Sequence, residues 1–214
     1  MTVRIAVIYY SATGNVHRLA EALAAGADKA GADVRLRRVA ELAPDSAIDM
    51  NPAWRAHLDQ TASTVTEANV ADLDWADGYA FGTPTRYGNP SAQLKQFLDQ
   101  TGPLWMAGAL ADKAATTFTS AINRHGGQES TILALNNVLY HWGAIIVAPG
   151  YTDPLLYAAG GNPYGTSFVA GMQGDRPGED ILAAARYQGT RLAQVAAALA
   201  PYRTQRQAAQ PSQV

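Results

Sequence analysis

The 214-residue sequence contains no cysteine. Without thiols the chain forms no disulfide, has no thiolate nucleophile, and offers no cysteine ligands to zinc or an iron–sulfur cluster. It also lacks an apolar run of about 18 residues, the length that a membrane-spanning helix needs. Residues 1–10 do not have the layout of a secretory signal peptide. These absences predict a protein without a membrane span, and we expect it in the cytoplasm.

A surplus of positive charge is also absent. The 16 Lys and Arg residues face 18 Asp and Glu residues, so the formal net charge is -2. Because nucleic-acid-binding proteins usually carry a basic surplus, the composition predicts no nucleic-acid partner. The only basic cluster, Arg35, Arg37 and Arg38, alternates with apolar residues and fits a half-exposed edge strand better than a polyanion site.

What the sequence does contain is an alternation of strand-like and helix-like segments. Short apolar or alternating runs predict five strands, at 3–10, 34–39, 72–81, 114–120 and 143–148. Apolar residues at helical spacing predict helices at 16–27, 91–100, 128–142 and 180–200. This order indicates parallel strands with right-handed crossovers. We therefore predict an α/β fold: a flavodoxin-like, doubly wound, five-stranded parallel sheet with helices on both faces.

The predicted domain covers residues 1–203, and residues 204–214 are expected to form a flexible tail. Two stretches do not fit the minimal strand–helix pattern: 44–69 is polar and weakly periodic, and 149–178 is rich in Gly, Pro and Tyr. Connections this long are often functional. The alternative is that each stretch is a surface excursion or a subunit contact without a role in the site, and both interpretations stay open.

Ligands of open α/β sheets bind at the carboxyl ends of the strands, which directs attention to three loops. The first, 11–16, offers two hydroxyls, an amide and backbone N–H groups at a helix start, and such a turn can hold a phosphate without Lys or Arg. An ordinary helix N-cap is the alternative. In the loop 82–90, Tyr87 can stack on a flat heterocycle and Arg86 can stabilise negative charge, although an ordinary turn fits too.

The loop 120–129 is polar and glycine-bearing, and it carries His125. His125 and His141 are candidates to reach the same edge, but neither has a second His four residues away, so no metal site is predicted. Trp105 is either a core residue or a lid over a flat ligand. No Ser-His-Asp arrangement or nucleophile elbow is present, so acyl transfer has no support.

Taken together, these loops resemble one family. Six strings occur in the order in which the WrbA family has them: 9–15, 82–89, 97–102, 104–105, 125–129 and 161–165. The string Gly-Thr-Pro-Thr-Arg-Tyr-Gly-Asn at 82–89, followed by Phe-Leu-Asp-Gln-Thr-Gly at 97–102, is highly specific. The WrbA proteins are flavodoxin-like, FMN-dependent NAD(P)H:quinone oxidoreductases. The resemblance covers roughly residues 3–199.

The resemblance implies a role for each loop. The FMN phosphate would be bound by Ser11, Ala12, Thr13, Gly14, Asn15 and Val16. The isoalloxazine ring would be flanked by Pro84, Thr85, Arg86 and Tyr87. Its other edge would be lined by Ser120, Ala121, Ile122, Asn123, Arg124, His125 and Gly126. His141 would reach the flavin, from this or a neighbouring subunit, and Arg86 and His141 would tune it.

The resemblance also implies the substrates and the assembly. Trp105 and Thr13 would contact the substrates; the family often has an aromatic residue at the position of Thr13, so the choice between NADH and NADPH stays open. The family forms homotetramers, as dimers of dimers, which the 149–178 excursion would help to build. The expected reaction is a two-electron, ping-pong reduction of a quinone. The alternatives are a flavodoxin-type electron carrier, which the net charge of -2 disfavours, and a flavin-binding regulatory protein.

Overall fold

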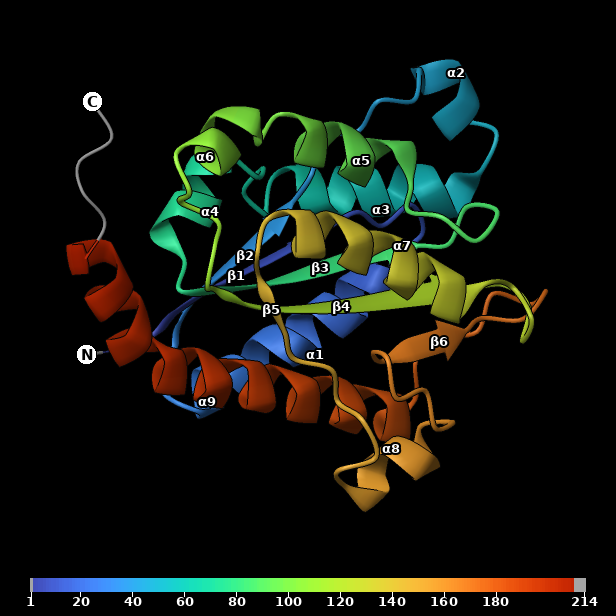
Figure 1. Ribbon diagram of the computed structural model, residues 1–214. Coiled ribbons are helices and arrows are strands. Elements are labelled where there is room, and N and C mark those ends of the chain that lie inside the picture. Colours follow the sequence, from blue (N-terminus) through green and yellow to red (C-terminus); the bar gives the residue numbers. More distant parts are fainter. Residues whose placement is uncertain (1, 210–214) are drawn as a thin grey trace.

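The computed structural model describes residues 2–209 and contains one α/β domain (Figure 1). The strands are β1 (Arg4–Tyr9), β2 (Asp33–Arg38), β3 (Gly78–Pro84), β4 (Ala114–Ala121), β5 (Ile145–Ile146) and β6 (Ser167–Val169). The longer helices are α1 (Asn15–Lys29), α3 (Pro52–Ala62), α5 (Ala92–Asp99), α7 (Gln128–His141) and α9 (Glu179–Ala209). The shorter helices are α2 (Asp45–Ile48), α4 (Val70–Trp75), α6 (Gly102–Met106) and α8 (Pro154–Ala158).

The sheet is parallel, with the order β2-β1-β3-β4-β5. This is the strand order of flavodoxin-like proteins, so the predicted flavodoxin-like fold is confirmed. The sixth strand, β6, is a continuation of the fifth. β5 pairs with Ala114 and Ala115 at the start of β4, and β6 pairs with residues 119–121 at its end, along the same edge. The first part of the 149–178 excursion, residues 149–166, therefore separates the two pieces of the last strand, and β6 lies within the excursion.

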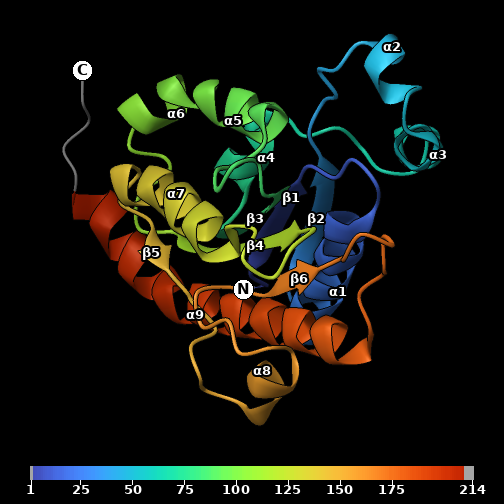
Figure 2. The same cartoon turned by 90° about the vertical axis from the view of Figure 1, so that its right-hand side faces the viewer.

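Helices cover both faces of the sheet (Figures 1 and 2). Alternate residues of β1 point to opposite sides: Ile5 and Val7 pack in the core under α1 and α9, while Ala6 and Ile8 pack in the core under α5 and α7. α1 and α9 approach very closely, because a Cβ added at Gly189 would lie 2.0 Å from the carbonyl oxygen of Leu23. Burial on both faces explains why the predicted strand pattern is almost continuously apolar.

Three predicted elements differ from the structure. Residues 70–75 form helix α4 rather than the start of a strand, because Asn69 and Asp72 make a reciprocal capping box there. The strand expected over 143–148 is reduced to two residues. Helix α9 continues to Ala209, so residues 204–209 of the expected tail are helical, and residues 210–214 lie outside the described part.

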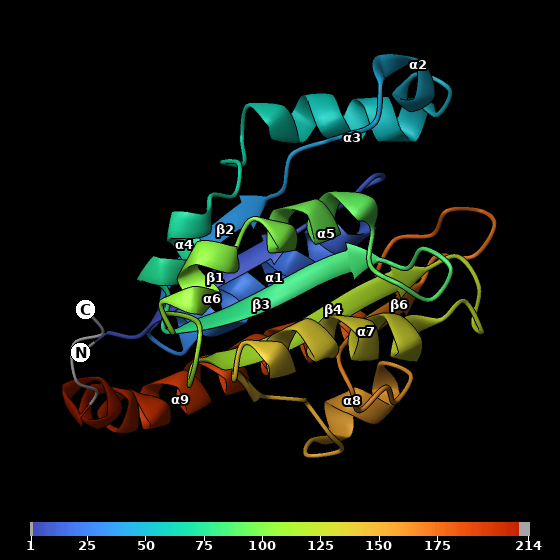
Figure 3. The same ribbon diagram turned by 45° about the horizontal axis from the view of Figure 1, so that its top comes forward.

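The polar stretch 44–69 is also structured. Helix α3 starts at Pro52 and is capped by the side chain of Asn51, which accepts hydrogen bonds from two backbone N–H groups. α2 and α3 project from the β2 side of the domain (Figures 2 and 3). Within residues 2–209, no helix combines the length and the apolar character required to cross a bilayer.

Candidate functional site

Three turns meet at the edge of the sheet where β1, β3 and β4 end. We call them the first turn (10–15), the second turn (84–90) and the third turn (120–127). Thr85 joins the last two, because its N–H donates to Ser120 O at 2.8 Å and its Oγ1 donates to Gly126 O at 3.2 Å. Tyr10 N donates to Gly82 O at 2.9 Å, which holds the first turn beside β3. The structure thus brings the three predicted loops together.

The first turn leads directly into α1. Gly14 is the N-cap residue, with a left-handed φ of 98°, and no side chain caps the helix. Ser11 Oγ accepts a hydrogen bond from Gly14 N at 3.1 Å, which closes the turn. An uncapped helix start leaves backbone N–H donors, together with the positive end of the helix dipole, for an anion. The first turn is therefore suited to a phosphate group.

The second turn presents an aromatic ring to solvent. Tyr87 has a left-handed φ of 52° and its side chain is fully exposed. The turn is closed by two backbone hydrogen bonds between Arg86 and Asn89, of 2.8 and 3.0 Å. A non-glycine residue in this conformation costs about 1 kcal/mol, and such strain gathers at functional sites. The exposed ring is available to stack on a flat ligand.

The third turn leads into α7 as the first leads into α1. Gly127, with a φ of 90°, is the N-cap, and again no side chain caps the helix. A Cβ at Gly127 would lie 2.8 Å from Gly88 Cα, so the second and third turns are packed together. Gln128 is buried, and its Oε1 has no hydrogen-bond partner among the described residues. A buried acceptor without a partner is costly, and a bound donor would satisfy it.

These features fit a flat, phosphorylated ring system such as FMN. The start of α1, after the first turn, has no side-chain cap and suits a phosphate. The second turn has the exposed ring of Tyr87, and the start of α7, after the third turn, has the unsatisfied acceptor of Gln128. Within residues 2–209, His, Asp and Glu side chains do not gather into a set that could hold a metal ion.

A half-buried hydrogen-bond network lies next to the first turn. Glu41 accepts hydrogen bonds from Tyr10 Oη at 2.7 Å, Trp54 Nε1 at 3.0 Å and Gln93 Nε2 at 2.7 Å. Burial raises the pKa of Glu41, but the hydrogen bonds donated by Ala43 N and these side chains lower it more, so the carboxyl stays below its usual range. This carboxylate connects β1, α3 and α5 beneath the site.

The sequence pattern did not predict one side chain at the first turn. Arg176, in the connection before α9, donates through Nη1 to the carbonyl oxygen of Thr13 and, at 3.1 Å, to Asn15 Oδ1. The residues lie more than 160 positions apart, so no local pattern indicates the contact. In the sequence, the one local feature that distinguishes Arg176 is the Arg-Pro pair at 176–177, in an otherwise glycine-rich stretch.

Two predicted site residues lie elsewhere in the chain. His141 is at the last position of α7, whose 14 residues separate it from the third turn by about 20 Å. Trp105 lies beside it on α6, and its Nε1 donates to His141 O at 3.0 Å. Figure 1 shows α6 at the opposite end of the domain from the turns after β3 and β4. Together with Trp142 and Leu98, they line a groove of about 300 Å³.

Comparisons with known proteins identify relatives over nearly the full chain. Residues 3–152 match the family described as NADPH-dependent FMN reductase. A protein named NAD(P)H dehydrogenase (quinone) from Geobacter sulfurreducens is 45% identical over 207 residues, covering 91% of this chain and 98% of its own. The protein of the same name from Geotalea uraniireducens is 44% identical over 206 residues, covering 92% and 99%.

Solved structures agree with this assignment. The structure described as a flavodoxin, WrbA-like protein from Agrobacterium tumefaciens is similar with a TM-score of 0.64 and 27% identity, and the match covers 92% of this chain and 99% of that one. An archaeal flavodoxin, at 16% identity and a TM-score of 0.59, shares the fold. The chain therefore belongs to the NADPH-dependent FMN reductase family and, within it, to the WrbA-like NAD(P)H dehydrogenases (quinone).

Proposed function

We propose that this chain is an FMN-dependent oxidoreductase that reduces quinones by two electrons with NADH or NADPH. The observation that carries the proposal is the meeting of three strand-end turns around an uncapped helix start and an exposed aromatic ring. The relatives' shared name, NAD(P)H dehydrogenase (quinone), supplies the reaction.

FMN, when bound, accepts two electrons as a hydride and passes them on. The protein groups bind and orient it. Backbone N–H groups of residues 11–16 hold the phosphate, and residues 84–87 and 120–126 flank the two edges of the ring. Arg86 is exposed and has no carboxylate within ion-pair distance among the described residues, so its guanidinium is available to stabilise negative charge on the reduced ring.

The exposed edge serves both substrates in turn. The first turn is half-buried, while Tyr87 and Ile122 are exposed, which leaves one open side for a stacked ligand. Since a single face is offered, we propose that the oxidised nicotinamide leaves before the quinone enters, with Thr13 close to the nicotinamide nucleotide. This order is the ping-pong reaction.

The site is completed by a neighbouring copy. Trp105 is half-exposed and His141 is exposed at the far end of α7, beyond reach of the turns in the same chain. We propose that the groove beside them faces the flavin of another copy, in a homotetramer built as a dimer of dimers. We also propose a cytoplasmic location, where NADH and NADPH are supplied, and no nucleic-acid partner.

An absorbance experiment in one cuvette tests the proposed activity. Protein reconstituted with FMN is expected to lose its flavin absorbance near 450 nm when NADH or NADPH is added, and to regain it when benzoquinone follows. A reconstituted sample that binds FMN but is not reduced by either nucleotide contradicts the enzymatic function. A sample that is reduced but fails to pass electrons to the quinone contradicts the proposal that a quinone is the substrate.

A further inference from the structure

The two stretches that do not fit the minimal fold meet at one point of the structure. His57, on α3 of the 44–69 stretch, and Arg176, at the end of the 149–178 stretch, both lie against Gly14. A Cβ added at Gly14 would lie 3.4 Å from His57 Nδ1 and 3.1 Å from Arg176 Nη1. Both excursions therefore contribute to the same place, on the side of α1.

Between them and α1 lies a cleft of about 560 Å³. Its floor is the side of α1 that carries His17 and Arg18, one wall is α3, and the other is formed by Arg176 and the first turns of α9 with Arg186. The cleft thus runs along α1, beside the helix start that receives the FMN phosphate. Its volume is within the range of small-molecule sites, about 300–1,000 Å³.

The cleft is basic, although the chain has a net charge of -2. Three guanidinium groups line it, and Arg186 is paired with Glu179, so Arg18 and Arg176 are the two cations that face the single lining carboxylate, Glu21. Arg176 donates only to neutral oxygen atoms, and Arg18 has no carboxylate within 4.0 Å among the described residues. Guanidinium groups without a carboxylate partner are the side chains that proteins use to bind phosphate.

Small residues keep the space between these charges open. Ala22 of α1 and Ala53 and Ala56 of α3 line the cleft, so no long side chain fills it. His57 faces this space; burial, together with the nearby His17 and Arg176, lowers its pKa to about 4, so at neutral pH its ring is uncharged and can donate one hydrogen bond. Cationic and neutral donors therefore surround an open volume of nucleotide size.

We propose that this cleft, which adjoins the FMN phosphate turn at Thr13 and Gly14, is a second anion site and that it binds the phosphate groups of a nucleotide. Arg18 and Arg176 contact the phosphate, and the side walls of α3 and α9 hold the rest of the ligand. The nicotinamide donor of the proposed function is one such nucleotide, and free adenine nucleotides are another source of the same chemistry. The proposal assumes only that FMN fills the first turn.

Calorimetric titration of the FMN-loaded protein at low salt tests this site. The probes are 2′,5′-ADP, which reproduces the phosphorylated end of NADPH, ADP, and inorganic phosphate. Saturable one-to-one binding of a nucleotide, tighter than that of phosphate, is expected. Preference for 2′,5′-ADP identifies NADPH as the source of the ligand, and preference for ADP identifies an unphosphorylated adenine nucleotide.

The matched variants are Arg18→Gln and Lys29→Gln. Both remove one positive charge from exposed positions of α1, but Lys29 lies at the other end of the helix, outside the cleft. R18Q is expected to weaken nucleotide binding about tenfold, as the loss of one charge-assisted contact does, and K29Q to leave it unchanged. Flavin absorbance in the same cell reports that FMN stays bound in both.

Three results would overturn the second site. They are no saturable nucleotide binding, equal weakening by R18Q and K29Q, and inorganic phosphate binding as tightly as either nucleotide. Binding to the apoprotein that disappears when FMN is loaded would place the ligand in the first turn and overturn it as well. None of these results depends on quinone reduction, so failure of this proposal and failure of the proposed activity are distinguishable.

Discussion

Gly14 is the residue at which the phosphate turn, α3 and the last connection meet. Its φ of 98° places it in the left-handed region, and a Cβ there would press on His57 and Arg176. Gly31, at the other end of α1, has a similar φ of 88° but open space around it. A substitution at Gly31 therefore measures the effect of the backbone conformation alone, whereas one at Gly14 also crowds His57 and Arg176.

Gly14→Ala is expected to weaken FMN binding at least tenfold, because the methyl group shifts Arg176 and the turn that receives the phosphate. Gly31→Ala is the matched control. Both substitutions should lower the free energy of unfolding by about 1 kcal/mol, since alanine is strained at positive φ. Fluorescence titration with FMN and urea unfolding measure the two quantities. Equal FMN affinity in both variants would show that the turn tolerates a side chain.

The pKa of His57 predicts a loss of stability in acid. Burial, followed by the charges of His17 and Arg176, lowers this pKa from 6.5 to about 4 in the folded chain. Between these pH values the unfolded chain binds a proton that the folded chain does not, so the free energy of unfolding falls as the pH drops through this window. The full effect is about 3 kcal/mol, reached below pH 4.

His57→Gln removes this titration. Urea unfolding at pH 7 and at pH 4 is expected to show a smaller acid loss for H57Q than for the parent chain. His125→Gln, which changes an exposed histidine of the third turn, should keep the parent's loss. If the free energy of unfolding falls equally in H57Q and H125Q between pH 7 and pH 4, His57 is protonated in the folded chain without penalty.

The Glu41 carboxylate joins helix α3 to the first turn and to α5. Glu41 Oε2 accepts from Trp54 Nε1 of α3 and from Tyr10 Oη, and Oε1 accepts from Gln93 Nε2 of α5. Backbone N–H groups of residues 42 and 43 donate to the same Oε1. Because α3 also forms one wall of the basic cleft, Glu41 couples the position of that wall to the first turn.

Glu41→Gln is expected to lower the free energy of unfolding by about 2 kcal/mol. The amide nitrogen of glutamine is a donor, so it cannot accept the hydrogen bonds that the carboxylate oxygen in its place accepts. Hydrogen exchange should be faster in residues 52–62 than in the parent chain, since α3 loses its attachment. Glu67→Gln is the control: Glu67 makes an exposed ion pair with Arg38, at 3.4 Å, that contributes little. Unchanged protection of α3 in E41Q would mean that apolar contacts alone hold the helix.

The elements that were predicted correctly are those with a strong local pattern. The continuous apolar run of β1 and the helical spacing of α1 depend on residues near one another in sequence, so the first turn between them was predicted too. α3 was missed because its composition is polar, although Asn51 and Pro52 are a recognisable helix start. The contact of Arg176 with Thr13 could not be predicted, since tertiary packing alone creates it.

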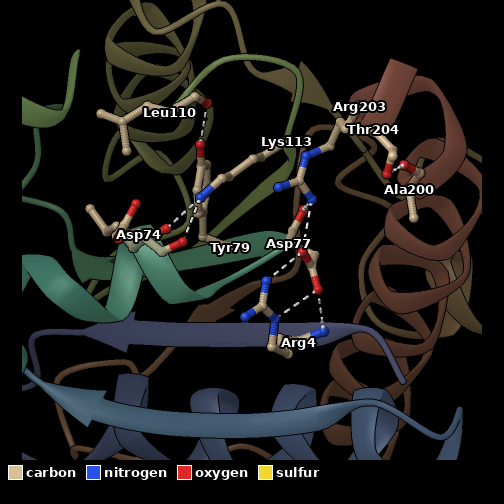
Figure 4. A network of polar contacts seen from close by, with 10 residues as sticks. Arg4, Asp74, Asp77, Tyr79, Leu110, Lys113, Ala200, Arg203 and Thr204 are labelled. Atoms are coloured by element: carbon tan, nitrogen blue, oxygen red, sulfur yellow. Dashed lines mark hydrogen bonds and ion pairs between the residues drawn. The ribbon is translucent and has the colours of Figure 1, made fainter. Parts of the chain in front are cut away.

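The ion pairs around Asp77 and the proposed site lie at opposite ends of the strands. Figure 4 shows Asp77, directly before β3, between the guanidinium groups of Arg4 and Arg203, with nitrogen–oxygen distances of 3.1 and 3.0 Å. These pairs fasten α9 to the amino-terminal edge. Buried Lys113 lies in the same network; its Nζ donates to two backbone carbonyls, and burial lowers its pKa to about 8. The carboxyl-terminal edge is left to the three turns.

The far position of Trp105 and His141 makes the proposed assembly testable by mixing two defective chains. Gly14→Val disables the first turn but keeps the α6–α7 groove, whereas the double variant W105A/H141A keeps the turns and loses the groove. Each alone should reduce quinone slowly while eluting at the tetramer position in size-exclusion chromatography. Either one eluting as a monomer would instead show that the substitution breaks the assembly.

Refolding the two variants together in equal amounts should restore activity. If each site takes its turns from one copy and its groove from another, random assembly gives about one quarter of the sites both intact parts. Recovery of about a quarter of the parent activity therefore supports a shared site. If turns and groove act within one chain, no mixed tetramer contains an intact site, because every chain carries a defect, and activity stays at the level of the separate variants.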